Sequence, residues 1–309
     1  MFVSGEVLVG AGVAGDTASP MTTPATLSHA DIDSGRTPAN VPGTGRLRFE
    51  LVNGRTAVVE SFAASPLKWV HPRHYGSAAW AVSSTYGGGL LGGDRIATTL
   101  RLGAGTRAVL TTQATTKIYR SDLAAEQHTD CFVGAGAFFL GASDRVVCFA
   151  RSSFRQRQRY ELAPGASLAV VDWLAAGRCD AGELWLFDAY RNRIEVFAGG
   201  RLAFMDALDL NQSAGPLAVR MGRFTSLATV LLIGPLVEPG ARELLARVQN
   251  EVVARTATTG FLAAASPLAV GGAVLRCAAV DVETMAANLR ALLAFVAGLI
   301  GEDPWARRW

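Results

Sequence analysis

The sequence has few charged residues and no long run of either sign. Only 18% of its 309 residues are Asp, Glu, Lys or Arg, and the formal net charge is +3. Apart from Arg307 and Arg308, no basic residues cluster, which argues against nucleic-acid binding. The longest apolar stretch near the C-terminus, residues 289–301, is too short to span a bilayer and contains Arg290. We therefore expect no nucleic-acid partner, no membrane partner and a cytoplasmic location.

Cysteine and histidine are also scarce, with four residues of each. The cysteines lie far apart and form no C-x-x-C pair, so we expect reduced, mostly buried thiols rather than a zinc site: Cys131, Cys148, Cys179 and Cys277. No G-x-S-x-G motif is present, which excludes the usual nucleophile elbow. These absences favour a protein that is not an enzyme.

Half of the residues are hydrophobic, which is enough for one large core. Residues 1–45 are rich in Gly, Ala, Thr, Ser and Pro, and we expect them to form a flexible N-terminal leader. Residues 46–309 contain no evident linker, which predicts a single β-rich domain. At its start, Asn53 and Gly54 separate two strand-like runs and predict a tight hairpin.

A weak repeat runs through the middle of the chain. Leu102, Val133 and Leu162 each precede a short turn that ends in glycine, and an apolar strand follows each turn. The spacings are 31 and 29 residues, with another strand-like run before each turn. Such a repeat, with no helix in it, predicts stacked β layers, as in a β-helix or solenoid. Amphipathic periodicity predicts two α-helices near the C-terminus, at residues 242–253 and 283–300.

Three glycines have the spacing of a dinucleotide-binding turn, G-x-G-x-x-G: Gly87, Gly89 and Gly92. That site requires a helix that begins at the third glycine and holds the phosphates at its N-terminus. Here residues 96–103 instead alternate with period 2, which predicts a strand. We therefore expect a tight turn with a close backbone approach, and no nucleotide site.

The glycine segment, residues 84–95, and the following residues 100–121 are similar to the signature of the urease accessory protein family UreD, also called UreH. Residues 65–72, 146–162 and 170–190 resemble further segments of that family, and the last is closest to its eukaryotic branch. One departure is Cys179, where the family often has histidine. The residues that carry the resemblance are Gly87, Gly88, Gly93, Thr111, Thr112, Gln113, Thr116, Lys117, Tyr119, Arg178 and Gly182.

The resemblance implies a scaffold for urease maturation. Such a protein binds apo-urease and recruits a UreF-type partner and, through it, a UreG-type GTPase that supplies nickel. It implies a β-rich fold with a couple of helices, and no stably bound cofactor, although nickel in transit is expected along an internal path. The alternative is a non-enzymatic β-solenoid protein that binds a ligand or another protein.

Asp94 and Glu183 are the candidate ligands for nickel in transit, because oxygen ligands can hold the ion and release it again. Each residue also has a purely structural interpretation. Asp94 would cap the backbone of its own turn. Glu183 would pair with Arg178 or Lys117, since a buried carboxylate needs a partner. The polar residues of 111–116 also allow two interpretations, a polar path along one strand face or cross-strand threonine pairs that stabilise a sheet. The tail, residues 302–309, is a candidate contact for the UreF-type partner.

Overall fold

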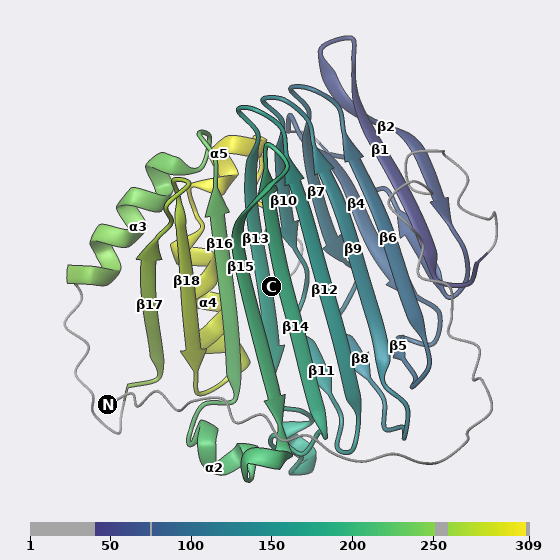
Figure 1. Ribbon diagram of the computed structural model, residues 1–309, viewed down its shortest axis with the longest axis vertical. Helices are drawn as coiled ribbons and strands as arrows, with labels where there is room; N and C mark the ends of the chain where they lie inside the picture. The colour runs from purple at the N-terminus through teal and green to yellow at the C-terminus, as the bar shows by residue number, and fades with distance from the viewer. Residues whose placement is uncertain (1–40, 75, 251–258, 307–309) are drawn as a thin grey trace, which may run out of the picture. The chain divides into compact units, whose positions relative to one another are not determined.

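The computed structural model describes residues 41–74, 76–250 and 259–306. Residues 1–40 lie outside this range, so the flexible leader stays a prediction. Residues 41–306 contain two β-sheets and a set of helices near the C-terminus (Figure 1). We call the seven-stranded sheet "sheet A" and the 11-stranded sheet "sheet B".

Sheet A is formed by long strands from the first two thirds of the chain. Its spatial order is β15 (Arg201–Asn211), β14 (Ala189–Ala198), β12 (Ser153–Leu162), β9 (Ala125–Val133), β6 (Arg95–Leu102), β1 (Thr44–Val52) and β2 (Arg55–Ala63). Strands β1 and β2 pair antiparallel on either side of Asn53 and Gly54, which confirms the predicted hairpin.

Sheet B extends beyond sheet A at the C-terminal side. Its spatial order is β17 (Phe261–Pro267), β18 (Ala273–Ala279), β16 (Ser226–Ile233), β13 (Ser167–Ala175), β10 (Phe138–Ala142), β7 (Arg107–Thr112), β4 (Ala79–Thr85) and β3 (Leu67–Val70). Three short strands complete it: β5 (Gly89–Leu90), β8 (Thr116–Ile118) and β11 (Val146–Cys148).

The repeat predicted from the sequence corresponds to coils that alternate between the two sheets. Strands β6, β9, β12 and β14 pair in parallel in sheet A, while β4, β7, β10 and β13 pair in parallel in sheet B. The turns between the sheets stack, since Gly105 N–H donates to the Ala135 carbonyl and Gly136 N–H donates to the Pro164 carbonyl. The prediction of stacked β layers is confirmed.

Four helices are described in the C-terminal third: α2 (Leu217–Met221), α3 (Glu238–Asn250), α4 (Val282–Leu292) and α5 (Val296–Ile300). Helix α3 begins four residues before the predicted start, because Pro239 is tolerated in a first helical turn. The helix predicted over 283–300 is divided in two, with a turn after Leu293 that brings Val296 to the same core. Helix α2 was not predicted.

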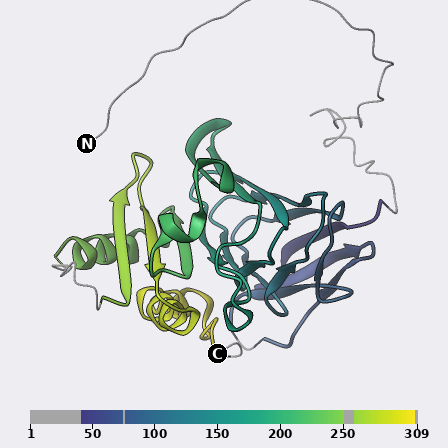
Figure 2. The same ribbon diagram turned by 90° about the horizontal axis from the view of Figure 1, so that it is seen from below.

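Three apolar cores hold these layers together. The first, which we call the helix core, lies between one face of sheet B and helices α3, α4 and α5 (Figure 2). The other two lie between the sheets. The turn-end core is near the stacked turns and contains Leu100, Phe139 and Val196, and the loop-end core is at the opposite strand ends and contains Phe154, Leu174 and Tyr190.

Candidate functional site

Three neighbouring strands of sheet B are interrupted at the same height. Residues 86–88 separate β4 from β5, residues 113–115 separate β7 from β8, and residues 143–145 separate β10 from β11. Each interruption is three residues long, whereas the next strand, β13, runs unbroken past all of them. The interruptions therefore leave an opening in the backbone ladder of sheet B.

Local chemistry explains the interruptions. Gly87 and Gly88 have φ values of 84° and 69°, a left-handed conformation that glycine adopts without strain. The Thr112 hydroxyl accepts a hydrogen bond of 2.8 Å from the Asp144 N–H, which links two of the interruptions. The Tyr119 hydroxyl donates to the Gly87 carbonyl at 3.2 Å. The strand predicted after the glycines is observed as β6, and no helix follows them. The opening that the glycine segment borders was not predicted.

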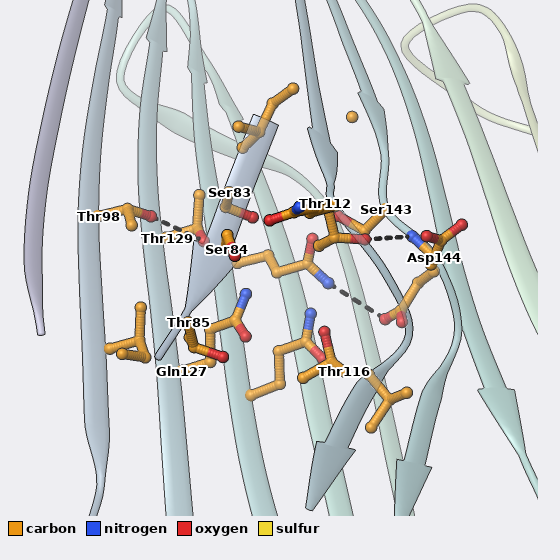
Figure 3. Close-up of a pocket in the computed structure, with 18 of the residues that line it drawn as sticks. Ser83, Ser84, Thr85, Thr98, Thr112, Thr116, Gln127, Thr129, Ser143 and Asp144 are labelled. Atoms are coloured by element: carbon orange, nitrogen blue, oxygen red, sulfur yellow. Dashed lines mark hydrogen bonds between the residues drawn. The ribbon is translucent and has the colours of Figure 1, made fainter. Parts of the chain in front are cut away.

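Behind the opening lies a cavity of about 440 Å³ between the sheets, which we call cavity 1. Its walls are rich in hydroxyl and amide groups that converge from both sheets (Figure 3). If each water takes ~30 Å³, an ion with six waters needs roughly 200 Å³, so the cavity has room for a hydrated cation. The polar wall residues include Ser83, Thr98, Thr112, Thr116, Gln127, Thr129, Ser143, Asp144, Gln156 and Gln158.

Sheet A contributes two polar rows to this cavity. In one row Thr98, Thr129 and Gln158 are neighbours in register, and the Thr98 hydroxyl donates to the Thr129 hydroxyl at 3.1 Å. In the next row Gln127 and Gln156 are neighbours. The buried Gln156 Oε1 has no hydrogen-bond partner among the described residues, which leaves an acceptor for water or a cation in the cavity.

Sheet B contributes a buried carboxylate, Asp172, on strand β13. It accepts hydrogen bonds from Gln158 Nε2 at 3.1 Å, from Tyr190 Oη at 3.4 Å and from Asn192 Nδ2. Burial raises the pKa of Asp172 to about 6; the hydrogen bonds from Tyr190, Gln158 and Asn192 oppose this rise, and the charge of Asp206 adds to it. Asp172 is therefore largely ionised at neutral pH.

A second cavity of about 280 Å³, cavity 2, lies on the other side of Asp172. It is lined by β14 and β15 of sheet A and by β13, β16 and β18 of sheet B. Asp172 lines both cavities. The two cavities and the side chains between them form what we call the polar layer.

The polar layer separates the two cores that lie between the sheets. On β12, Phe154 belongs to the loop-end core, Gln156 and Gln158 line cavity 1, and Tyr160 belongs to the turn-end core. On β13, Asp172 lies between Val170 of the turn-end core and Leu174 of the loop-end core, so both strands change from apolar to polar and back at the same height.

Several residues singled out in the sequence line cavity 1: Gly88, Thr112, Gln113, Thr115 and Thr116. Thr111 points to the other face of the strand, where its buried hydroxyl donates to the Ala142 carbonyl at 2.7 Å. One face of this segment therefore lines a polar cavity, and the other binds the sheet backbone.

Asp94 and Glu183 do not line either cavity. Asp94 Oδ2 accepts a hydrogen bond of 2.8 Å from the Leu91 N–H and so caps its own turn. Glu183 binds Arg178 through both carboxylate oxygens and accepts from the Ala150 N–H at 3.1 Å. The bond from Arg178 is the main cause that lowers the pKa of Glu183. Both structural alternatives are thus observed, and the role of these carboxylates as nickel ligands stays a prediction.

The remaining signature residues stabilise the loops at the loop end of the coils. The Tyr119 ring meets Phe149 edge-on at 5.3 Å, and the Arg178 guanidinium lies 4.5 Å from the centre of the same ring. Gly182 ends the short helix η1 (Cys179–Ala181). Gly93 N–H donates to the Ala124 carbonyl, and Lys117 is exposed on β8.

Among the described residues, no three His, Cys, Asp or Glu side chains converge as a metal cluster. No helix in the described ranges is long and apolar enough to cross a bilayer. Three cysteines are buried and Cys179 is exposed. In the tail predicted to contact a UreF-type partner, Trp305 is buried in the helix core. Residues 307–309 lie outside the described residues, so the predicted contact stays a prediction.

Comparisons with known proteins agree with the resemblance. A sequence model of the family described as UreD urease accessory protein matches residues 41–309. Urease accessory protein UreD of Sorangium cellulosum (strain So ce56) is 44% identical over 94% of this chain and 91% of its own length. The UreD protein of Anaeromyxobacter sp. (strain Fw109-5) is 47% identical over 86% of this chain and 89% of its own length. Urease accessory protein D of Oryza sativa subsp. indica is 36% identical over 69% of this chain and 71% of its own length.

Proposed function

We propose, since this chain belongs to the UreD family of urease accessory proteins, that it passes nickel through its polar layer toward apo-urease. A role in urease maturation follows from family membership. The route of the ion and the identity of the proteins on either side are proposals. The observation that carries the route is that Asp172 lines both cavities, each of which has walls from both sheets.

The chemistry of the layer suits an ion that must bind and then leave. Cavity 1 offers mostly neutral oxygen ligands, from hydroxyl and amide groups, which hold a divalent cation weakly. Asp172 adds a negative charge at the junction of the cavities, where its anionic form is stabilised by donors from Gln158 and Asn192. Several weak sites in sequence permit transfer better than one strong site does.

The scaffold itself is proposed to act without catalysis. It would bind apo-urease and recruit a UreF-type protein, and through it a UreG-type GTPase that supplies the nickel. An opening in sheet B and a second cavity beyond Asp172 give such an assembly one face for the donor and another for the acceptor. No cofactor needs to remain bound in this scheme.

The test is nickel incorporation into urease by a purified accessory set that contains Asp172→Asn. We expect nickel per urease active site to fall roughly tenfold, the effect of losing about 1.4 kcal/mol of ion stabilisation. Pull-down of urease with the UreF-type protein should be unchanged. The matched control is Asp130→Asn, which removes a carboxylate from the outer face of sheet A, beside Arg157.

The same assay separates this route from the one predicted from the sequence. Asp94→Asn and Glu183→Gln should leave nickel loading intact if the ion passes Asp172. Full loading with Asp172→Asn, together with a loss for Glu183→Gln, would place the route at the loop end instead.

A further inference from the structure

The open side of cavity 2 is where sheet B extends past the edge of sheet A. Strand β15 is the edge strand of sheet A, and beyond β13 sheet B continues with β16 and β18. Within the described ranges, no strand of sheet A pairs beyond β15. Cavity 2 is therefore closed on this side by side chains rather than by backbone.

One ion pair crosses this gap between the sheets. Arg276 of β18 donates through Nη2 to Asp206 Oδ1 of β15, and both residues line cavity 2. By contrast, the arginine pairs on the outer face of sheet A, such as Arg191 with Asp209, join strands of the same sheet. The Arg276–Asp206 pair therefore holds one sheet to the other at the mouth of a cavity.

The two partners differ in their access to solvent. The Arg276 side chain is 63% exposed, whereas that of Asp206 is only 12% exposed. The guanidinium can therefore be reached from outside, while the carboxylate faces the cavity. In register across sheet B, Arg276 is next to Thr229, and Thr229 is next to Asp172. The pair thus ends the row of polar residues that begins at Asp172.

We propose that the Arg276–Asp206 ion pair is a latch on cavity 2, and that a carboxylate on a docking protein opens it by binding Arg276. This inference rests on the proposed passage of a cation. A guanidinium stays charged at all physiological pH values, so in the closed state it repels a cation at the mouth and neutralises Asp206. When a partner carboxylate takes the guanidinium, the mouth is cleared and Asp206 attracts the ion.

The exchange is feasible because a second carboxylate can reach the exposed guanidinium, while the entering cation replaces the guanidinium beside the largely buried Asp206 carboxylate. A carboxylate on an incoming surface replaces Asp206 as the partner of Arg276 at a similar free energy. The exposed guanidinium fixes the chemistry of that surface as acidic, and a protein that receives the ion is the natural occupant of this mouth.

The latch can be tested without nickel or urease, so its failure is distinct from a failure of the proposed function. Thr229→Cys places a thiol in cavity 2, in a background where the exposed Cys179 and the native Cys277, which also lines this cavity, are replaced by serine. The measured quantity is the rate at which a small cationic methanethiosulfonate reagent modifies this thiol. Leu208→Cys, on the facing sheet, is a second probe position in the same cavity.

We expect Arg276→Gln to accelerate labelling roughly tenfold, corresponding to about 1.4 kcal/mol. Asp206→Asn should not accelerate it, because the guanidinium then stays at the mouth without its neutralising partner. The double exchange Arg276→Asp with Asp206→Arg should restore slow labelling. The control is Arg242→Gln, which breaks the exposed Arg242–Glu238 pair on α3 and should have no effect. An unchanged rate in the Arg276→Gln variant, at both probe positions, would overturn the latch, and so would equal acceleration by Asp206→Asn.

The partner's chemistry is tested with a short polyglutamate peptide. It should accelerate labelling when Arg276 is present and have no effect on the Arg276→Gln variant, while a polyserine peptide should have no effect on either. Equal rates with polyglutamate and polyserine would overturn the role assigned to an acidic partner.

Discussion

The polar layer and the loop-end core lie next to each other on the same strands, yet the core is filled by apolar side chains whereas the polar layer contains two cavities. Phe154 is fully buried among apolar side chains, whereas Gln156, two residues further on the same face of β12, lines a cavity and has an unpartnered oxygen. The backbone ladder is continuous through both positions. The coil therefore sets the spacing of these side chains, and their polarity distinguishes the close-packed core from the neighbouring polar cavity.

The largest expected effect is a difference in stability between Phe154→Ala and Gln156→Ala. Phe154→Ala should lower the free energy of unfolding by about 3–5 kcal/mol, because it leaves a void in a close-packed core. Gln156→Ala should lower it by less than about 1 kcal/mol, because the cavity already holds space beside it. Urea denaturation of the two variants measures both values. Equal losses would show that the polar layer is packed as tightly as the core.

The next effect is in the pH dependence of stability. Burial raises the pKa of Asp172 from its ordinary value of 3.8 to about 6 in the folded protein, so the folded state binds this proton more tightly than the unfolded state. Stability should therefore fall as pH rises from about 4 to about 6, by at most about 3 kcal/mol. Asp172→Asn should remove this slope in urea denaturation series at fixed pH values.

A carboxylate outside the polar layer gives the opposite sign and sharpens the comparison. A bond from Asn211 is the main cause that lowers the pKa of Asp209, and Arg191 contributes in the same direction. The stability that Asp209 adds is present above pH 4 and is lost as pH falls below that value. Asp209→Asn should change the slope only below about pH 4; a change between pH 4 and 6 would contradict the assignment to Asp172.

The smallest effect compares two adjacent threonines. Thr112→Val removes the acceptor of the Asp144 N–H at the opening of cavity 1, and Thr111→Val removes a donor to the Ala142 carbonyl on the opposite strand face. Each should cost about 1 kcal/mol in urea denaturation. Only Thr112→Val should change nickel loading of urease, since only Thr112 lines the cavity. Equal effects on loading would argue against an ion path along this face.

Much of the fold follows from local signals that act at short range. The hairpin at Asn53 and Gly54, the three stacked turns and the strand after Gly92 all follow from turn chemistry or period-2 alternation, and all are observed. The division between α4 and α5 was missed, because apolar residues continue through the turn at residues 293–295 and the periodicity hides it.

The site was found only in part, and for a physical reason. On β12 the outward positions are arginines, so Gln156 and Gln158 look like members of a strand that is polar on both faces. Only the buried Phe154 and Tyr160 at either end show that the glutamines point inward. Asp172 lies in a strand that is buried on both faces, so alternation gives no direction for its side chain. The signal that could have identified Asp172 is that it is the one acidic residue in the otherwise apolar strand β13.

The three-residue interruptions of sheet B have a consequence for how the aperture is controlled. Its rim is part of the sheet, because the hydrogen bond from the Asp144 N–H to the Thr112 hydroxyl links two of the three interruptions. Its width is set by chain length at residues 86–88, 113–115 and 143–145, and a single inserted or deleted residue there would resize it while the flanking strands keep their register. The size of the opening in sheet B therefore depends on the number of residues in each interruption.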